Sequence, residues 1–256
     1  MPRVPGSLRA LLTDLIDYAG LYPPASLPLA IVEERYRGFR ASPESWMLRR
    51  LVLPASRLAE ARIAAEWKVA LIVEEASGAL PPQVECLETK GLDVESSLPV
   101  YYEAPVSAIF RGFAKVRTGG LTPDAIPSAD QLARFLCEAA QRKLPFKATA
   151  GLHHPVRSER ALTYAPDSPR AAVHGFLNVF AAATMAWHGM EQARVAALLE
   201  ERDAAALEFG DDALVWHGCR VAVDQIRAAR RDFAHGFGSC SFEEPVSELR
   251  ELDLLP

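Results

Sequence analysis

Several features that would assign a protein to a class at once are missing or scarce in this chain of 256 residues. No apolar stretch reaches about 18 residues, so we expect no membrane-spanning helix and no membrane partner. No basic run is longer than two residues and the net charge is -5, so a nucleic-acid partner is not expected either. The four cysteines, Cys86, Cys137, Cys219 and Cys240, are not spaced as metal ligands. They are typical of reduced thiols in a cytoplasmic protein.

The first twenty residues also lack the clean apolar block of a signal peptide, because Asp14 and Asp17 interrupt it. We therefore expect a mature cytoplasmic protein. Internal repeats and low-complexity segments are not evident. Half of the residues are hydrophobic, which is enough for a full core, and the length suits a single α/β domain over residues 1–256.

Short apolar segments that alternate with helix-like segments predict the fold. The candidate strands are Arg50–Pro54, Trp67–Val73, Val84–Thr89, Pro99–Glu103, Phe113–Arg117 and Pro145–Ala150. Alternation of strands and helices indicates a parallel sheet. We predict an α/β fold of the TIM-barrel type, a (β/α) barrel with N-terminal helices and a helix-rich C-terminal third. An open parallel sheet is the alternative.

Apolar residues at helical spacing predict the helices. The expected ranges are 8–16, 28–39, 56–65, 128–143, 171–190, 191–205 and 221–233, with a hairpin over 207–216. Residues 174–178 are alternatively a seventh strand, and some early connections are too short for a full helix. Asp17, Tyr18 and Tyr22, at the end of the first helix, either face a site or cover the core in a plain turn.

Two lysines at the ends of predicted strands are the first candidates for chemistry. Lys115 and Lys147 each follow a phenylalanine, and the strand–helix–strand unit between them would bring both strand ends to one edge. An amine is a nucleophile only when it is deprotonated, and repulsion among the two lysines and Arg117 would lower their pKa values from ~10.4. One lysine would then form a Schiff base with a carbonyl substrate. In the alternative, each lysine turns outward beneath a helix and pairs with a carboxylate.

The same two segments resemble a known family. Residues 113–120, FAKVRTGG, resemble the Schiff-base strand of the deoxyribose-phosphate aldolases, which are class I aldolase barrels, and residues 146–152, FKATAGL, resemble their next strand. The resemblance implies that Lys115 is the Schiff-base lysine and that Lys147 lowers its pKa. Glu103 is the nearest candidate for the catalytic carboxylate by strand order. Arg117 replaces a small residue, and the whole chain looks more like an uncharacterised bacterial family.

A pair of histidines follows the second lysine strand. Side chains of His153 and His154 would point in opposite directions on an extended segment. One of them would serve as a general acid or base, since a histidine pKa lies near neutrality. With Glu103 or Glu88 they would alternatively hold a divalent metal. In the third interpretation, one histidine is exposed and the other packs against Pro155.

Two glycine-containing stretches, 118–120 and 236–241, offer backbone N–H groups and hydroxyl groups to an anion. Loops after the last strands of a barrel often hold phosphate, and the second stretch lies late enough for that role. Otherwise, residues 236–242 form a small, flexible tail. The expected substrate-binding residues are Arg117, Thr118, Gly119, Gly120, Thr149, Ser239 and Ser241.

Together these features predict an enzyme, a carbon–carbon lyase of the aldolase type that uses a lysine Schiff base and no cofactor. The expected catalytic residues are Lys115, Lys147, Glu103, His153 and His154. The substrate would be a small anionic carbonyl or sugar-phosphate-like molecule, because the cations make a locally positive pocket. The alternatives are a metal-dependent lyase or hydrolase and a non-catalytic anion-binding barrel. The apolar helix 171–190 is either a homo-oligomer surface or part of the chain's own core.

Overall fold

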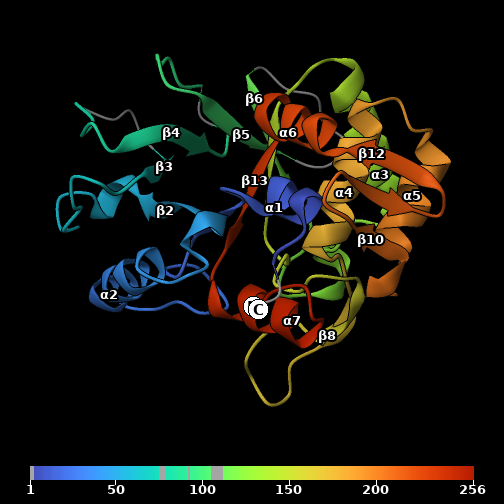
Figure 1. The fold of residues 1–256 in the computed structure, drawn as a ribbon. Helices are drawn as coiled ribbons and strands as arrows, with labels where there is room; N and C mark the ends of the chain where they lie inside the picture. Colours follow the sequence, from blue (N-terminus) through green and yellow to red (C-terminus); the bar gives the residue numbers. More distant parts are fainter. Residues whose placement is uncertain (1–2, 75–78, 92, 105–111) are drawn as a thin grey trace.

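The computed structural model describes residues 3–74, 79–91, 93–104 and 112–256. Eight parallel strands close into a barrel in the order β1-β13-β7-β6-β5-β4-β3-β2 (Figure 1). The barrel strands are β1 (Ile16–Tyr18), β2 (Leu48–Pro54), β3 (Val69–Val73), β4 (Val84–Thr89), β5 (Val100–Ala104), β6 (Phe113–Arg117), β7 (Phe146–Thr149) and β13 (Ala234–Ser239). The TIM-barrel prediction is therefore confirmed, and the open sheet is excluded.

Two barrel strands were not predicted. The first expected helix, residues 8–16, is wrong at its end: α1 stops at Leu12, where Thr13 N–H bonds the carbonyl of Arg9, and Asp14 has a φ of 48°. Residues 16–18 then form β1. The predicted tail 236–242 is also wrong, because its first residues belong to β13, which pairs with β1 and β7. These two strands close the barrel.

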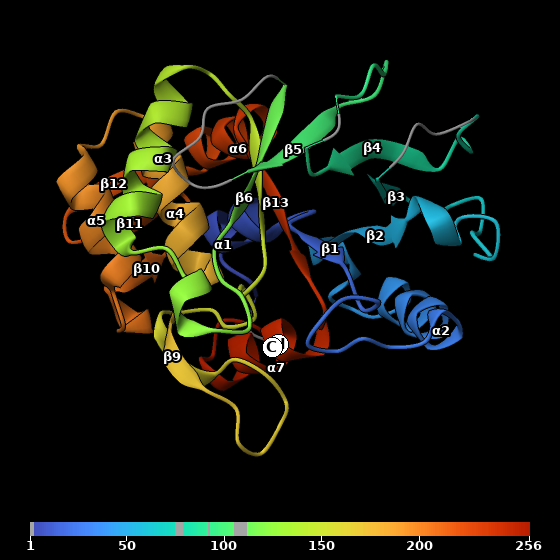
Figure 2. The ribbon, with the colours of Figure 1, turned by 180° about the vertical axis from the view of Figure 1, so that it is seen from behind.

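Helices are distributed unevenly around the barrel. The α-helices are α1 (Gly6–Leu12), α2 (Leu29–Arg40), α3 (Ala129–Gln141), α4 (Phe176–Trp187), α5 (Gln192–Glu200), α6 (Val223–Asp232) and α7 (Glu243–Glu251). In Figures 1 and 2, α3, α4 and α5 gather on one side of the molecule, and β3, β4 and β5 lie on the other. The described residues between β2 and β6 include no α-helix, so the expected helix 56–65 is wrong; it is a single 3-10 turn, Ala55–Arg57.

The C-terminal third adds short sheets to its helices. The hairpin predicted over 207–216 is confirmed as β10 (Leu207–Phe209) and β11 (Ala213–Trp216), extended by β12 (Cys219–Ala222). Residues 174–178 do not form a strand. Residues 174 and 175 follow β9 (Arg170–Val173), which pairs with β8 (Ser158–Ala161), and residues 176–178 form the first turn of α4.

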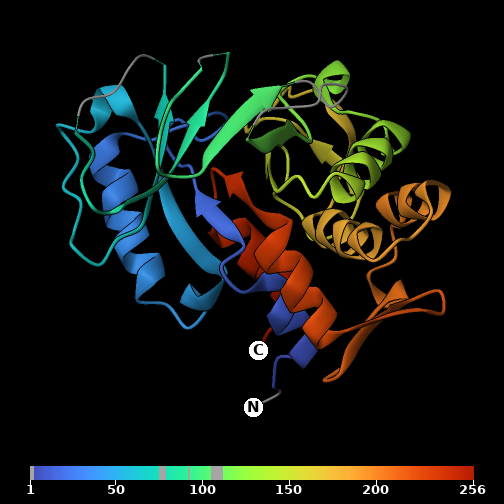
Figure 3. The same cartoon turned by 90° about the horizontal axis from the view of Figure 1, so that it is seen from above.

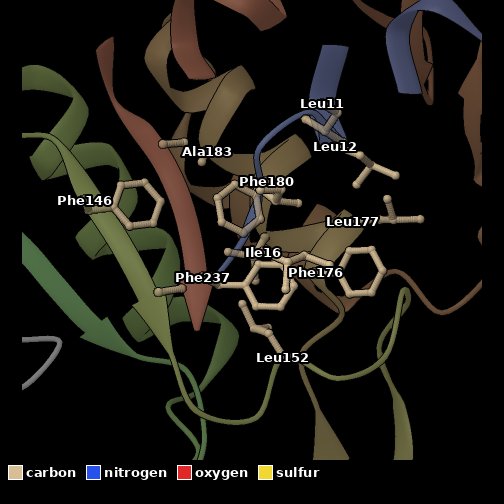
Figure 4. Packing of buried hydrophobic residues seen from close by; sticks show 14 of the residues in the cluster. Leu11, Leu12, Ile16, Phe146, Leu152, Phe176, Leu177, Phe180, Ala183 and Phe237 are labelled. Carbon is tan, nitrogen blue, oxygen red and sulfur yellow. The ribbon is translucent and has the colours of Figure 1, made fainter. Parts of the chain in front are cut away.

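The helix α4 belongs to the chain's own core rather than to an exposed oligomer surface. Every residue from Phe176 to Ala186 is buried. Phe180 stacks near Phe146 of β7, with ring centroids 6.3 Å apart, and lies 5.8 Å from Phe237 of β13 (Figure 4). Burying an aromatic side chain contributes about 1.5–3 kcal/mol, so this packing fixes the two strands that flank the candidate site. No helix in the described part of the chain is long and apolar enough to cross a membrane.

The helix α3 connects β6 to β7 and begins with a capping box. The Ser128 hydroxyl accepts a hydrogen bond from Gln131 N–H at 3.2 Å, and the Gln131 side chain accepts one from Ser128 N–H at 2.9 Å. Such a reciprocal cap satisfies two of the N–H groups that a helix start leaves free. The helix therefore starts at a defined place, which sets the return of the chain into β7.

Candidate active site

The two candidate lysines are neighbours. Strands β6 and β7 pair in parallel, with Lys115 directly opposite Lys147. Lys147 contacts carboxylates on β1 and β4, and Lys115 contacts carboxylates on β4 and β5. Only side chains that point into the barrel can reach across to those strands. Ala114 and Val116, which alternate with Lys115, are buried in the hydrophobic core instead.

Three carboxylates hold the two ammonium groups. Lys147 Nζ lies 2.5 Å from Asp17 Oδ2 and also donates to Glu88 Oε1. Lys115 Nζ lies 2.9 Å from Glu88 Oε2 and 2.9 Å from Glu103 Oε2. Glu88 therefore bridges the two lysines, with one carboxylate oxygen on each. Lys147 is only 2% exposed, and its charge is tolerated there because it is paired.

The expected direction of the lysine pKa shift is wrong. Burial lowers the pKa of Lys115, but the nearby Glu88 and Glu103 outweigh it, and the pKa is raised. Burial likewise opposes the charge of Lys147, and Asp17 and Glu88 raise its pKa well above the usual range. A carboxylate, Glu88, lies between the two cations, and the repulsion argument did not include it. In the resting protein both amines are protonated.

The pKa values of the carboxylates are lowered, whereas those of the lysines are raised. Burial would raise the pKa of Glu88, but Lys147 and Lys115 lower it to about 2. The pKa of Glu103 is also lowered, since Lys115 and Arg117 outweigh its burial. The alternative prediction, that each lysine pairs with a carboxylate, is confirmed. Its expectation that the lysines turn outward beneath a helix is wrong, because the pairs lie inside the barrel.

The pairs continue in both directions through the barrel. At one end, Arg117 Nη1 lies 3.1 Å from Glu103 Oε1. At the other, Arg50 lies 3.9 Å from Asp17 and 2.9 Å from Glu85. Glu85 in turn lies 3.6 Å from Lys68. We call this set the interior ion-pair network; it runs in the order Lys68, Glu85, Arg50, Asp17, Lys147, Glu88, Lys115, Glu103 and Arg117.

Two buried polar atoms beside the network have no hydrogen-bond partner among the described residues. They are Asp17 Oδ1 and the Tyr22 hydroxyl. Tyr22 packs with the barrel-interior cluster that includes Cys86 and Tyr101, and burial followed by Glu88 raises its pKa. Buried polar groups are normally paired, so these two atoms are exceptions beside the network. Sequence reasoning named Asp17 and Tyr22 as residues that could face a site, and it missed Arg50.

The predicted histidines bond to α7 rather than to the lysine carboxylates. His153 Nδ1 lies 2.7 Å from Glu244 Oε2, and its Nε2 lies 3.7 Å from Cys240 Sγ. His154 Nδ1 lies 2.6 Å from Glu248 Oε1. Burial would lower the pKa of His153, but its hydrogen bonds with Cys240 and Glu244 raise it to about 9. The two neighbouring rings contact different carboxylates, as alternation predicts.

The residues that were expected to bind a metal in the alternative interpretation have other partners. Glu88 and Glu103 are engaged by lysines, while the two histidines are engaged by α7. Within residues 3–74, 79–91, 93–104 and 112–256, no group of three or more His, Cys, Asp or Glu side chains is placed to hold a metal ion. The residues that the sequence suggested as ligands are therefore not brought together.

The hydroxyl groups that were expected to bind an anion form hydrogen bonds with backbone groups instead. The Thr118 hydroxyl donates to the carbonyl of Ala150 at 2.6 Å. Ser241 N–H donates to the Ser239 hydroxyl at 3.3 Å, and the Ser241 hydroxyl accepts from Glu244 N–H at 3.1 Å near the start of α7. These bonds order the rim of the barrel.

The glycines and the cation of the rim have different roles. Gly119 lies against Gly151, where an added Cβ would be 3.0 Å from the opposite Cα, so the two loops pack backbone to backbone. Gly120 has a similarly close approach to Ala125, and Thr149 ends β7 beside them. The Arg117 side chain is 50% exposed and contacts Glu103. It is the positive group that links the interior lysines to solvent.

Comparison with known proteins adds nothing to this geometry, because no family model, no curated protein and no solved structure matches the chain.

Proposed function

We propose that the barrel is an enzyme that acts on a small anionic carbonyl compound, with carbon–carbon lyase chemistry of the aldolase type through a Schiff base on Lys115. The observation that carries the proposal is the shared carboxylate: Glu88 bridges Lys115 and Lys147 inside the barrel. Enzymes that use lysine as a nucleophile need a group beside it that accepts and returns protons. Glu88 and Glu103 are within hydrogen-bond distance of Lys115.

Lys115 is the better nucleophile of the pair by position. Its side chain is 8% exposed against 2% for Lys147, and it contacts Glu103, which leads to the half-exposed Arg117. Lys147 is enclosed by Asp17 and Glu88. We assign Lys147 the role of a fixed positive charge that keeps Glu88 ionised. The resemblance to deoxyribose-phosphate aldolases likewise implies that Lys115 forms the Schiff base, but it gives Lys147 the role of lowering the pKa of Lys115, which differs from the role assigned here.

The proton balance follows from the contacts. The Lys115 ammonium passes one proton to Glu103, and the free amine attacks the substrate carbonyl carbon. The carbinolamine oxygen takes up two protons, the one returned by Glu103 and one from the nitrogen, and leaves as water, which gives the protonated imine and restores the Glu103 carboxylate. A carboxylate then removes the proton from the β-hydroxyl group, the carbon–carbon bond breaks, and its electron pair enters the imine to form the enamine. Because carboxylates raise the pKa of Lys115, we expect adduct formation to increase with pH above neutrality.

The anionic part of the substrate has a candidate partner in Arg117. Its guanidinium is half-exposed and 3.1 Å from Glu103, so an incoming carboxylate or phosphate can share it. All four cysteines are free, which fits the reducing cytoplasm that we propose as the location of the protein.

Reductive trapping tests the proposal. The protein is incubated with small aldehydes, ketones and keto acids at several pH values, borohydride is added, and the added mass is located by peptide mass spectrometry. We expect the mass on Lys115, its loss in Lys115→Arg, and no change in Lys143→Arg, a matched variant of an exposed lysine. Adducts only on exposed lysines, or Lys115 as readily acetylated as Lys143, would refute the proposal.

A further inference from the structure

A cavity lies where several barrel strands begin. It has a volume of about 790 Å³ and is lined by the N-terminal segment, α1, α6 and the starts of several barrel strands. Arg49 is the second residue of β2, Glu85 the second of β4 and His235 the second of β13, and all three line it. The lysine site lies further along the strands, where Lys115, the third residue of β6, pairs with Lys147 of β7. In Figure 3, α1 (blue) and α6 (orange-red) lie side by side close to the N-terminus.

The lining of this cavity is strongly basic in a chain whose net charge is -5. Seven arginine and lysine side chains face it, against two carboxylates, Asp14 and Glu85. Three of the seven cations have a carboxylate partner of their own. Lys68 lies 3.6 Å from Glu85, Arg227 3.0 Å from Asp224, and Arg231 2.7 Å from Asp232.

The other four cations, Arg3, Arg9, Arg49 and Arg230, have no carboxylate partner within the ranges that the structure describes. Arg9 lies over the ring of Trp46, 4.5 Å from its centroid. Arg49 donates to the carbonyl of His235 at 2.9 Å. Carbonyl dipoles and ring faces orient guanidinium groups without cancelling their charge.

Arg230 is built into the wall of the cavity. Its Nε donates to the carbonyl of Leu11 at 2.9 Å and its Nη2 to that of Thr13 at 3.0 Å, and it also bonds Ala234. It therefore supplies a fixed positive field while its donors are occupied. Arg3, Arg9 and Arg49 are left to contact a ligand.

The ionisation of the buried groups agrees with an unbalanced positive potential. Burial, and then Arg49, lowers the pKa of Arg230 to about 9. Burial and Arg49 also lower the pKa of His235 to about 4. His235 is accordingly neutral: its Nε2–H donates to the carbonyl of Arg231 at 3.0 Å, and its Nδ1 accepts from the Tyr101 hydroxyl at 2.7 Å.

We propose that this cavity binds a small molecule that carries a diphosphate group. Ligand pockets typically enclose about 300–1,000 Å³, so the volume suits a metabolite and is too small for a macromolecule. Arginine is the residue best suited to phosphate oxygens, and three unpaired guanidinium groups match the charge of a diphosphate. The inference does not depend on the lysine chemistry, because the ion pairs of Lys115 and Lys147 go to Asp17, Glu88 and Glu103, none of which lines the cavity.

Calorimetric titration of the full-length protein with inorganic pyrophosphate tests the proposal. We expect one site per chain, weakening as salt is raised, since the attraction is electrostatic. The double variant Arg3→Gln Arg9→Gln should bind at least about tenfold more weakly, because two charge-assisted contacts to the anion are lost. Thermal unfolding in the absence of ligand verifies that the variant is folded, and the single variant Arg3→Gln gives the same test with less disturbance.

Two matched variants make the result specific. Arg57→Gln removes an exposed arginine elsewhere, and Arg117→Gln removes the cation of the lysine site. Arg57→Gln should bind pyrophosphate as the unmodified protein does, and Arg117→Gln should keep the affinity of this cavity, because Arg117 does not line it. The proposal is overturned if no binding is seen at about 1 mM pyrophosphate in low salt. It is also overturned if Arg117→Gln weakens binding while the Arg3→Gln Arg9→Gln variant does not.

Discussion

Replacement of Glu88 by glutamine is the sharpest test of the barrel interior. The side chain is 2% exposed and each of its oxygens contacts one ammonium group. Glutamine keeps the size and one acceptor oxygen but removes the negative charge. Lys115 and Lys147 would then face each other across a neutral group, each with one remaining carboxylate, Glu103 or Asp17.

The magnitude follows from the ionisation of Glu88. Its pKa falls from 4.5 to about 2 on folding, and this shift converts to about 3 kcal/mol at 1.36 kcal/mol per unit. Loss of one member of a buried ion pair costs about 3–5 kcal/mol, which agrees. The contribution of a carboxylate with a lowered pKa is fully present above about pH 4.5, and it is lost as the pH falls towards 2. The difference in the free energy of unfolding between the variant and the unmodified protein should therefore be largest at neutral pH.

Urea denaturation at about pH 7.5 and about pH 3.5 measures both the size and the pH dependence. The matched control is Glu60→Gln, which removes an exposed partner of Arg57 and should change the free energy of unfolding by less than about 0.5 kcal/mol. A loss below about 1 kcal/mol for Glu88→Gln at neutral pH, or a loss that stays the same at both pH values, would refute the bridging role.

Further predictions concern three other positions. His153→Gln should cost about 3 kcal/mol below about pH 6.5, because hydrogen bonds with Cys240 and then Glu244 raise the histidine pKa to about 9; the difference should vanish as the pH rises through 9 in urea denaturation. Tyr101→Phe leaves His235 Nδ1 without its donor and should lower the free energy of unfolding by about 1–3 kcal/mol in thermal melts. Gly236→Ala should cost more than about 1 kcal/mol in the same assay, because its φ is 151° and the new Cβ would lie 2.5 Å from a backbone oxygen; equal stability would contradict the described closure of the barrel.

The strands β2 to β7 were predictable from sequence, whereas β1 and β13, which close the barrel, were not. Strands β2 to β7 have apolar runs of ordinary length bounded by turn residues, so pattern alone identifies them. The strand β1 has three residues, and its Ile16 continues the helical spacing of α1. In β13, Gly236 and Gly238 weaken any strand pattern. Both strands form because closing a barrel pairs every edge, which is a tertiary gain that a local pattern does not contain.

The candidate site was likewise predictable only in part. Lys115 and Lys147 were found because each stands at the same relative place in a predicted strand on either side of a clear helix, and the structure shows that these two strands pair. The direction of their pKa shifts depends on carboxylates from β1, β4 and β5, which lie far away in sequence. Glu88 and Asp17 were visible as single residues, but a linear pattern cannot show that they meet the lysines.

The interior ion-pair network also constrains how this sequence can change over time. Each charge in it touches neighbours of the opposite sign, so one altered residue leaves its partners uncompensated. Coupling between contacting residues makes their effects non-additive, and a paired exchange costs less than either single exchange. Among descendants of this protein, these inward positions should therefore change in correlated pairs or stay fixed, whereas the outward apolar positions of the same strands drift one at a time. Substitutions at the positions of the interior ion-pair network should therefore be accepted together rather than singly.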